Sequence, residues 1–467
     1  MRWIVGSYLW GQPENPVEVG PYTECVSTMI KTKNFHPAYN WYVVGVLFTV
    51  SVLGYVDRVV LSFLVEPIKA ELALSDAQLG AVTGLAFALL YVLGGVFLGR
   101  LIDRGNKILI LAICILVWSV ATGATGFVSG FALLFIARMF VGVGEAGLNP
   151  AAIGIISNRF DEKDVQKPIG LFTMGLFVGG GLAMILGGQL LAFFDNQGPY
   201  QLPYLGETSS WRLVFISLSF PGLLLALLLV LTVRDGNTAV SNSDSDTVRQ
   251  EPINEANSIS ATNFARKNLA LLAILSASVV CWSMNNYGLL NWYPAMLMRT
   301  YEMSPMLVAN TYGPAFLVGG IAGCLAVTPA LNWLRQRYSE RAVPLICTVS
   351  MGVLGVTTAV GPLLPNIPLA IFFACLNLFV SAMSVTSVFV LIVAIIPQHL
   401  RGLYTGLYLA LVNLTGAAFG SVIVGMASDH IFGPERLNLS ISLVAVLFGP
   451  IAAYLMYRAS WLPVRTK

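Results

Sequence analysis

The stretch WYVVGVLFTVSVLGYVDRVVLSFL, residues 41–64, decides the fold of this 467-residue chain. It is long and apolar enough to cross a bilayer as one helix, which takes roughly 17 to 25 residues. Two adjacent charges, Asp57 and Arg58, nevertheless lie within it. A charge near the bilayer centre costs on the order of 3 kcal/mol, so it is seldom kept without a partner or a water-filled cavity. The rest of the chain should therefore supply partners for this pair.

The composition of the whole chain is that of a membrane protein. It is 56% hydrophobic and only 10% charged, with a mean hydropathy of +0.76. Twelve apolar runs recur along it, separated by short polar breaks. Because lipid offers the backbone no hydrogen bonds, and the runs lack the alternation of a barrel strand, we expect an all-α membrane protein. The predicted spans are 41–64, 78–102, 107–127, 131–157, 167–194, 211–233, 267–298, 306–334, 341–362, 367–396, 402–428 and 437–458.

The longest polar interval lies between the sixth and seventh predicted helices. Its segment SNSDSDTVRQEPINEANSIS is too poor in apolar residues to build a core, so it predicts a linker between two six-helix halves. The first 40 residues are either a flexible tail or, before Met29, an upstream start that matters little. We expect an N-terminal tail at 1–40, a six-helix bundle at 41–233, a linker at 234–266, a second bundle at 267–458 and a C-terminal tail at 459–467.

Lysines and arginines predict the orientation, because short cytoplasmic loops retain them. If the N-terminus is inside, the outer loops carry only Lys69, Arg299, Arg436 and perhaps Arg212. Both tails and the linker should then be cytoplasmic. The net charge of +3 requires no nucleic-acid partner.

The fourth predicted helix contains the partners that the first helix needs, in the segment ARMFVGVGEAGLNPAA. Arg138 and Glu145 are seven residues apart, close to two turns, and so share one face about 10 Å apart along the axis. Asp57 and Arg138 lie at the same depth, which lets Asp57 face Arg138. Glu145 lies deeper, near the midplane, where secondary transporters place substrate and coupling ion. We expect Asp57 and Glu145 to carry the coupling proton; the alternative is a permanent salt bridge between helices 1 and 4.

The second half has no comparable charges, but its seventh helix contains MNNYGLLNWYPAML. Amides and aromatic rings can orient a ligand while offering it apolar area. A packing role is the alternative for each of these side chains. Together with Arg58 and Arg138, the candidates for substrate binding or gating are Asn285, Tyr287, Asn291, Trp292 and Tyr408.

The segment GRLIDRGNK, residues 99–107, follows the second helix and resembles the G-x-L-x-D-R-x-G-R-[RK] pattern of the major facilitator superfamily. The match is imperfect, since Asn106 replaces the usual glycine and one closing basic residue is absent. Gly99, Asp103 and Arg104 are the predicted conformational latch, in which Asp103 accepts bonds from a facing helix N-terminus or basic side chain. The alternative is a basic loop that only sets topology.

Further segments resemble the bacterial Spinster-like transporters within that superfamily. They are GYVDR at residues 54–58, R-x-x-x-G-x-G-E-A at 138–146, WRLVF at 211–215, and the eleventh-helix segment that begins at Arg401. The resemblance implies that Asp57, Arg58, Arg138 and Glu145 form a proton-coupling and substrate-gating cluster in a bacterial inner membrane. The neighbouring anion:cation symporter family shares much of this pattern, so the substrate stays open between an amphipathic molecule and a sugar acid or aromatic acid.

We therefore predict a proton-coupled secondary transporter that works by alternating access. No ATP-binding G-x-x-x-x-G-K-[ST] loop is present, so an ion gradient should supply the energy. An enzyme would need a reactive cluster, yet the three histidines, His36, His399 and His430, lie at loops or helix ends. A channel would not readily explain duplicated halves and a latch. We expect a small-molecule substrate, a proton and the lipid bilayer as partners, no cofactor or metal, no nucleic acid, and a monomer.

Overall fold

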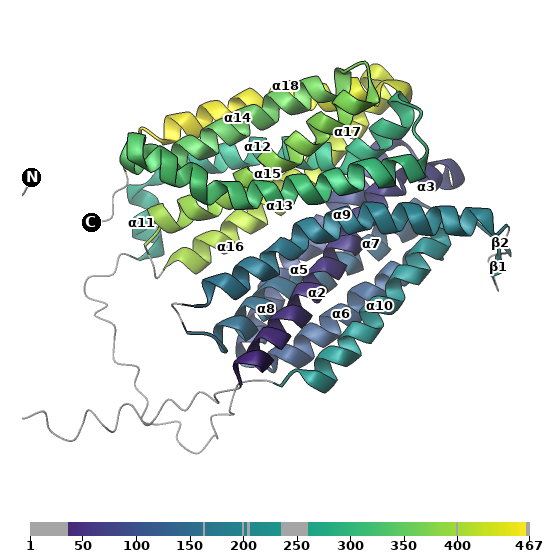
Figure 1. Ribbon diagram of the computed structural model, residues 1–467, viewed down its shortest axis with the longest axis horizontal. Helices are drawn as coiled ribbons and strands as arrows, with labels where there is room; N and C mark the ends of the chain where they lie inside the picture. The colour runs from purple at the N-terminus through teal and green to yellow at the C-terminus, as the bar shows by residue number, and fades with distance from the viewer. Residues whose placement is uncertain are drawn as a thin grey trace, which may run out of the picture.

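The computed structural model describes residues 36–161, 164–198, 200–202, 206–234, 260–397 and 400–463 (Figure 1). Most of the predicted tails and linker lies outside these residues. Within the described part, twelve helices are long and apolar enough to cross a membrane. Each coincides with a predicted span, and the ends differ by at most four residues. The prediction of an all-α fold with twelve spanning helices is confirmed.

Six spanning helices make up the first half. Short helix α3 (Val65–Leu72) follows the first of them, and the antiparallel hairpin of β1 (Tyr200–Leu202) and β2 (Gly206–Thr208) follows the fifth. In chain order the six spanning helices of this half are α2 (Pro37–Phe63); α4 (Asp76–Gly80), η1 (Ala81–Ala86) and α5 (Phe87–Arg104) in continuous succession; α6 (Lys107–Thr125); α7 (Phe131–Ala146) with α8 (Leu148–Ser157); α9 (Gln166–Asn196); and α10 (Ser210–Thr232).

The second half begins with the short helix α11 (Ala261–Lys267). Its spanning helices are α12 (Leu269–Thr300); α13 (Pro305–Tyr338); α14 (Ala342–Val360) with η4 (Gly361–Leu363); α15 (Ile367–Ile395); α16 (Arg401–Leu411), η6 (Val412–Gly420), α17 (Ser421–Ala427) and η7 (Ser428–Phe432) in continuous succession; and η8 (Pro434–Arg436) with α18 (Leu437–Ala459). The short turn η3 (Ser339–Arg341) joins α13 to α14.

Polar residues fix where several helices begin. The Ser75 hydroxyl accepts from the Gln78 amide while the Gln78 side chain accepts from the Ser75 amide, which forms a capping box at the start of α4. Asn106 accepts from the amides of Ile108 and Leu109, both at 3.0 Å, and caps α6. Asn106, which replaces the glycine of the superfamily pattern, therefore caps α6 with a side chain that glycine lacks.

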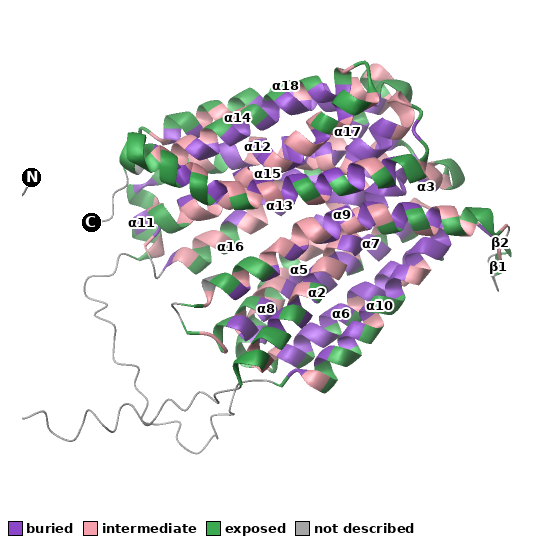
Figure 2. Cartoon of the chain, in the orientation of Figure 1, coloured by how far each residue is buried: buried purple, intermediate pink, exposed green. Residues whose placement is uncertain are grey.

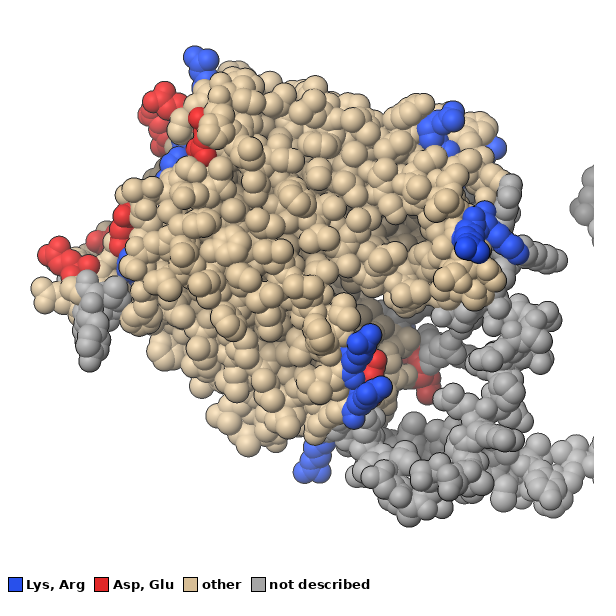
Figure 3. All heavy atoms as spheres, turned by 180° about the vertical axis from the view of Figure 1, so that it is seen from behind, with Lys and Arg blue, Asp and Glu red and all other residues tan. Residues whose placement is uncertain are grey.

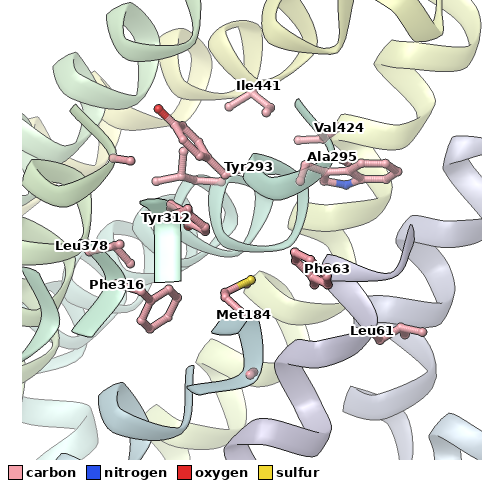
Figure 4. Close-up of a cluster of buried hydrophobic side chains, with 14 of the residues drawn as sticks. Leu61, Phe63, Met184, Tyr293, Ala295, Tyr312, Phe316, Leu378, Val424 and Ile441 are labelled. Carbon is pink, nitrogen blue, oxygen red and sulfur yellow. The ribbon is translucent and has the colours of Figure 1, made fainter. Parts of the chain in front are cut away.

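The two halves meet along α9 and α13, which lie side by side in Figure 1, and along the second and eleventh spanning helices. At Gly188 a Cβ atom would overlap that of Ala309, so glycine permits the close approach of α9 to α13. Figure 4 shows side chains of both halves in one apolar cluster, with Phe63 and Met184 from the first half and Tyr312 and Phe316 from the second.

The halves separate at one end of the molecule. We name this the linker end, because α10 ends and α11 begins there; the opposite end, which carries β1 and β2, is the hairpin end (Figure 1). The main packing partners of α16 all belong to its own half. A Cβ atom added to Gly99 or Gly406, near the linker end, would meet no other atom within 4 Å. The two halves are therefore in contact at the hairpin end and apart at the linker end.

The surface distribution of side chains fits a bilayer. In Figure 2 the buried residues line the helix contacts, and green exposed segments lie on the outer faces. Large apolar side chains such as Phe97 and Leu231 are more than 70% exposed, which is favourable against lipid. On the face shown in Figure 3, charged side chains gather at the two ends and leave the surface between them uncharged. The protein is a multi-pass integral membrane protein.

Candidate functional site

A buried ion pair joins the first and fourth spanning helices. The Arg58 guanidinium on α2 donates to the Glu145 carboxylate on α7 through Nη2 at 2.6 Å and through Nε at 3.1 Å. The Glu145 side chain is 2% exposed and that of Arg58 is 17% exposed. Glu145 is therefore enclosed, while Arg58 keeps one side open.

Arg138 occupies the expected depth but makes a different contact from the one predicted. Its Nη1 donates to the backbone carbonyl of Asp57 at 3.1 Å, and its Nη2 donates to that of Arg58 at 3.3 Å. Helical spacing predicted that Asp57 faces Arg138. The two charged groups do interact electrostatically, but no hydrogen bond joins their side chains among the described residues. The reason is that Arg138 reaches the backbone of α2, while Arg58 takes the carboxylate of Glu145.

The Asp57 carboxylate is fully buried without a donor. Among the described residues, neither of its oxygens accepts a hydrogen bond, although the Trp118 indole lies beside it. One oxygen of Glu145, Oε1, is in the same situation. A buried charge without hydrogen bonds is costly, so a bound proton is the simplest way to neutralise such a group. Among the described residues, Asp57 can take up a proton without losing a hydrogen bond, and Glu145 has one unpaired oxygen, Oε1, that can receive one.

Aromatic rings surround the exposed side of Arg58. Its guanidinium carbon lies 4.0 Å from the ring centre of Phe87, 5.3 Å from that of Tyr91 and 5.4 Å from that of Tyr55. Such cation–π contacts stabilise an arginine that has lost much of its water. Arg58 therefore stays charged and positioned without depending on Glu145 alone.

Arg58 also borders a small cavity between the halves. The cavity measures about 20 Å³, which is room for one water molecule. Both halves line it, with Tyr55, Arg58 and Val59 from α2, Tyr287, Leu290 and Asn291 from α12, and Phe316 from α13. Tyr287 and Asn291 thus lie where the sequence predicted a second-half wall for the site.

The other predicted second-half residues lie in the helix packing. Trp292 donates its indole N–H to the Ser421 carbonyl at 2.8 Å, and Tyr408 packs edge-on against Phe389 at 5.4 Å. Asn285 is buried, and its amide oxygen accepts no hydrogen bond within the described residues. These three do not line the small cavity.

Asn291 bridges the halves. Its amide oxygen accepts from the Ser62 hydroxyl at 3.1 Å, and its amide nitrogen donates to the Ser421 hydroxyl at 2.6 Å. The residue therefore links α12 to both α2 and α17, at the hairpin side of the cavity that it lines. We interpret it as part of the closed end of the site.

The predicted latch residues lie at the linker end. Asp103 and Arg104 are exposed, and no hydrogen bond or ion pair joins either to the second half in the part of the chain that is described. Arg401, which begins the eleventh spanning helix, donates to the backbone carbonyl of Ile396, in its own half. The contacts that the predicted latch would make are therefore absent among the described residues in this conformation, as separation of the halves at this end requires.

A second charged cluster, at the hairpin end, was missed by sequence reasoning. Arg299 at the end of α12 binds both oxygens of Asp76 at 2.7 and 2.9 Å and donates to Glu66 at 2.8 Å. Lys69 also donates to Asp76, and so does the Ser428 hydroxyl at 2.6 Å. Lys69 and Arg299 had served only as orientation markers. The sequence did contain a signal for this cluster: Asp76 is an acidic residue at a helix start, and Arg299 is an arginine at a helix end in the other half.

Another hairpin-end carboxylate stabilises the first half internally. Glu71 accepts a hydrogen bond from Trp211 and one from Arg212 at 2.8 Å. Burial acts to raise the pKa of Glu71, but hydrogen bonds from Ser209, Trp211 and Arg212 outweigh it and lower that pKa. Among the described residues, no group of three or more His, Cys, Asp or Glu side chains is arranged so that it could hold a metal ion.

The fold and the buried charges together define a two-half membrane transporter. Residues 47–421 match the family model described as the Major Facilitator Superfamily, and the chain belongs to this superfamily. An MFS-type efflux pump of Mycolicibacterium smegmatis is 27% identical over 432 residues, which cover 91% of this chain and 93% of the pump. A probable L-galactonate transporter of Escherichia coli is 26% identical, over 62% of this chain and 60% of that protein.

A solved structure has the same architecture. It is that of a bacterial homolog of the human lysosomal transporter Spinster, in an inward-facing and unoccupied conformation. The two chains are 25% identical, with a TM-score of 0.75, and the match covers 91% of this chain and 98% of the other. The predicted resemblance to the Spinster-like family is confirmed, and the protein is a major facilitator transporter of a small molecule.

Proposed function

We propose that this transporter moves an organic anion, or an amphipathic molecule with an anionic head, by proton-coupled alternating access. The observation that carries the proposal is the Arg58–Glu145 pair at the cavity between the halves. Arg58 is the only arginine in the lining of that cavity, and its counter-ion is a carboxylate that can take up a proton.

Coupling follows from competition for Arg58. While Glu145 is ionised, it occupies the guanidinium through two hydrogen bonds. A proton on Glu145 removes that counter-ion and leaves Arg58 free to bind the anionic group of a substrate from the open side. Loss of the proton restores the pair and displaces the substrate. The Asp57 and Glu145 carboxyl groups interact electrostatically, so we expect them to titrate together.

Arg138 holds α2 and α7 in position for this exchange of the Glu145 carboxylate and the substrate at Arg58. Its hydrogen bonds to the carbonyls of Asp57 and Arg58 fix the backbone from which both side chains project. It is fully buried and does not line the cavity, so we assign it a positioning role in place of direct substrate binding.

Alternating access is supported by the asymmetry of the two ends. The halves are joined at the hairpin end and separated at the linker end, and the similar Spinster homolog is described as inward-facing. We propose that the linker end faces the cytoplasm, that both tails are cytoplasmic, and that the protein lies in a bacterial inner membrane as a monomer. The predicted excess of basic residues near the linker end supports this orientation.

Two substrate classes fit the site. The aromatic rings around Arg58 offer apolar area beside the charge, which suits an amphipathic molecule with an anionic head. Tyr287 at the cavity can hydrogen-bond a hydroxyl group, which suits a sugar acid, the class to which the name of the L-galactonate relative points. Both substrate classes carry an anionic group that Arg58 would bind.

The test is an uptake screen in proteoliposomes under an imposed pH gradient. Sugar acids, aromatic acids and lysolipids would be offered in turn, each with and without a proton ionophore. The proposal predicts that at least one anion accumulates with the gradient and that the ionophore abolishes accumulation. Transport of only neutral or cationic compounds, or accumulation unaffected by the ionophore, would contradict it.

A further inference from the structure

The second and eleventh spanning helices cross where each contains a π-helical segment. These segments are η1 and η6, and they pack against each other. A Cβ atom on Gly84 in η1 would overlap the backbone carbonyl oxygen of Ala417 in η6. The two backbones are therefore in direct contact, which only glycine allows at this position. Segments of π-helix within longer helices often occur at functional sites.

On the hairpin side of this crossing, the two helices are held together. Asp429 in η7 accepts a hydrogen bond from the Asp76 amide at 3.0 Å and one from the Ala77 amide at 2.7 Å. These amides belong to the first two residues of the second spanning helix, Asp76–Arg104. Unpaired amides at a helix start carry partial positive charge, so a carboxylate there makes strong hydrogen bonds. Asp429 thus caps a helix of the other half.

On the linker side of the crossing, the same two helices diverge. A Cβ atom on Gly95 or Gly99 of α5, or on Gly402 or Gly406 of α16, would meet no other atom within 4 Å. Asp103, at the linker end of the second helix, is exposed. One helix pair is therefore closed on one side of the Gly84–Ala417 contact and open on the other.

We propose that Asp429 is a second latch, at the hairpin end of this helix pair, which opposes the Asp103 latch already predicted at the linker end; the pair pivots where Gly84 meets Ala417. Asp429 caps the second helix in the present conformation, whereas Asp103 binds the eleventh helix when the linker end closes. Each carboxylate lies at the last turn of one helix and acts on the first turn of the other. The relative strength of the Asp429 and Asp103 contacts sets the populations of the conformation closed at the hairpin end and the conformation closed at the linker end. The inference rests on the alternating access that we propose for the protein.

The test is hydrogen–deuterium exchange of the full-length protein in lipid nanodiscs, without substrate or pH gradient. Asp429→Asn, which keeps the shape but removes the charge, should shift the population ratio toward the state closed at the linker end by about tenfold. Exchange should become faster at residues 73–80 and, at the same time, slower at 99–106 and 400–406. Asp103→Asn should keep exchange fast at the linker end, and the double variant should lie between the two.

Glu435→Gln is the matched control, because Glu435 is an exposed carboxylate six positions further on at the same end. It should leave both ends unchanged. Faster exchange confined to residues 73–80 in Asp429→Asn would overturn the proposal, since Asp429 would then be a local cap and no latch. The same change in Glu435→Gln would overturn it as well. The measurement needs no transport, so failure of proton coupling in the uptake screen would leave its outcome intact.

Discussion

The central and hairpin-end clusters contain the same kinds of charged residue but differ in how completely these are paired. At the hairpin end, each oxygen of Asp76 accepts two hydrogen bonds, from Lys69, Arg299 and Ser428. At the centre, both oxygens of Asp57 and one of Glu145 accept none among the described residues. A fully paired buried carboxylate is a stable clamp. A carboxylate with an unpaired oxygen can take up a proton there, and for Glu145 that proton would weaken its pair with Arg58.

The largest effect is expected at Arg138. Arg138→Ala removes both hydrogen bonds to the backbone of α2 and a buried positive charge that acts on Asp57 and Glu145. Transport should fall by about a hundredfold or more, because a small misplacement of the charged groups of a site can cost on the order of a hundredfold in rate. Initial rates of counterflow would measure it, with gel filtration to confirm folded protein. Normal transport by well-folded Arg138→Ala would remove the centre from the mechanism.

Arg299 sharpens the contrast, because its loss should affect stability more than coupling. Arg299→Ala leaves Asp76 and Glu66 without their shared cation, which should lower the free energy of unfolding by about 3 kcal/mol. Thermal unfolding in detergent measures the change, and Arg436→Ala, an exposed arginine at the same end, is the control. The remaining folded protein should still couple uptake to the pH gradient. Loss of coupling at full stability would show that the hairpin-end cluster is no mere clamp.

A smaller effect is expected at the disengaged latch. Asp103→Asn should move the population several-fold further toward the state open at the linker end, because the closed state alone uses the carboxylate. A cysteine introduced at Leu101, which is exposed in α5, would report access of a water-soluble thiol reagent. Unchanged labelling in the variant would mean that Asp103 serves only topology or local folding.

The smallest effect concerns Glu71, a paired carboxylate outside the spanning helices. Its pKa is lower in the folded protein than its usual value of 4.5, so the ionised form stabilises the fold. This contribution is complete above pH 4.5 and is lost as the pH falls through the folded-state pKa. Glu71→Gln should therefore unfold more easily than the wild type at pH 7, with the difference shrinking at pH 4. An equal difference at both pH values would contradict the assignment.

The sequence predicted the fold well because membrane spans are set by local composition. Apolar length identified all twelve helices, and helical spacing placed Arg138 and Glu145 on the face that meets α2. Spacing does not determine which atom a long side chain reaches, so the backbone carbonyls that accept from Arg138 were not predicted. The hairpin-end cluster brings together residues as distant as Asp76 and Asp429. Such contacts depend on how the halves pack, and the π-helical segments at the crossing have no signal in the apolar pattern.

The central claim is that Glu145 exchanges a proton for its bond to Arg58. The most direct measurement compares counterflow with uptake driven by a pH gradient in proteoliposomes containing Glu145→Gln, with Asp57→Asn in parallel. The amide mimics the protonated acid, so Glu145→Gln should retain substrate exchange while losing accumulation against a gradient. Asp57→Asn should do the same only if both groups share the proton. Gradient-driven accumulation at the wild-type level in Glu145→Gln would contradict the assignment and move the coupling site elsewhere.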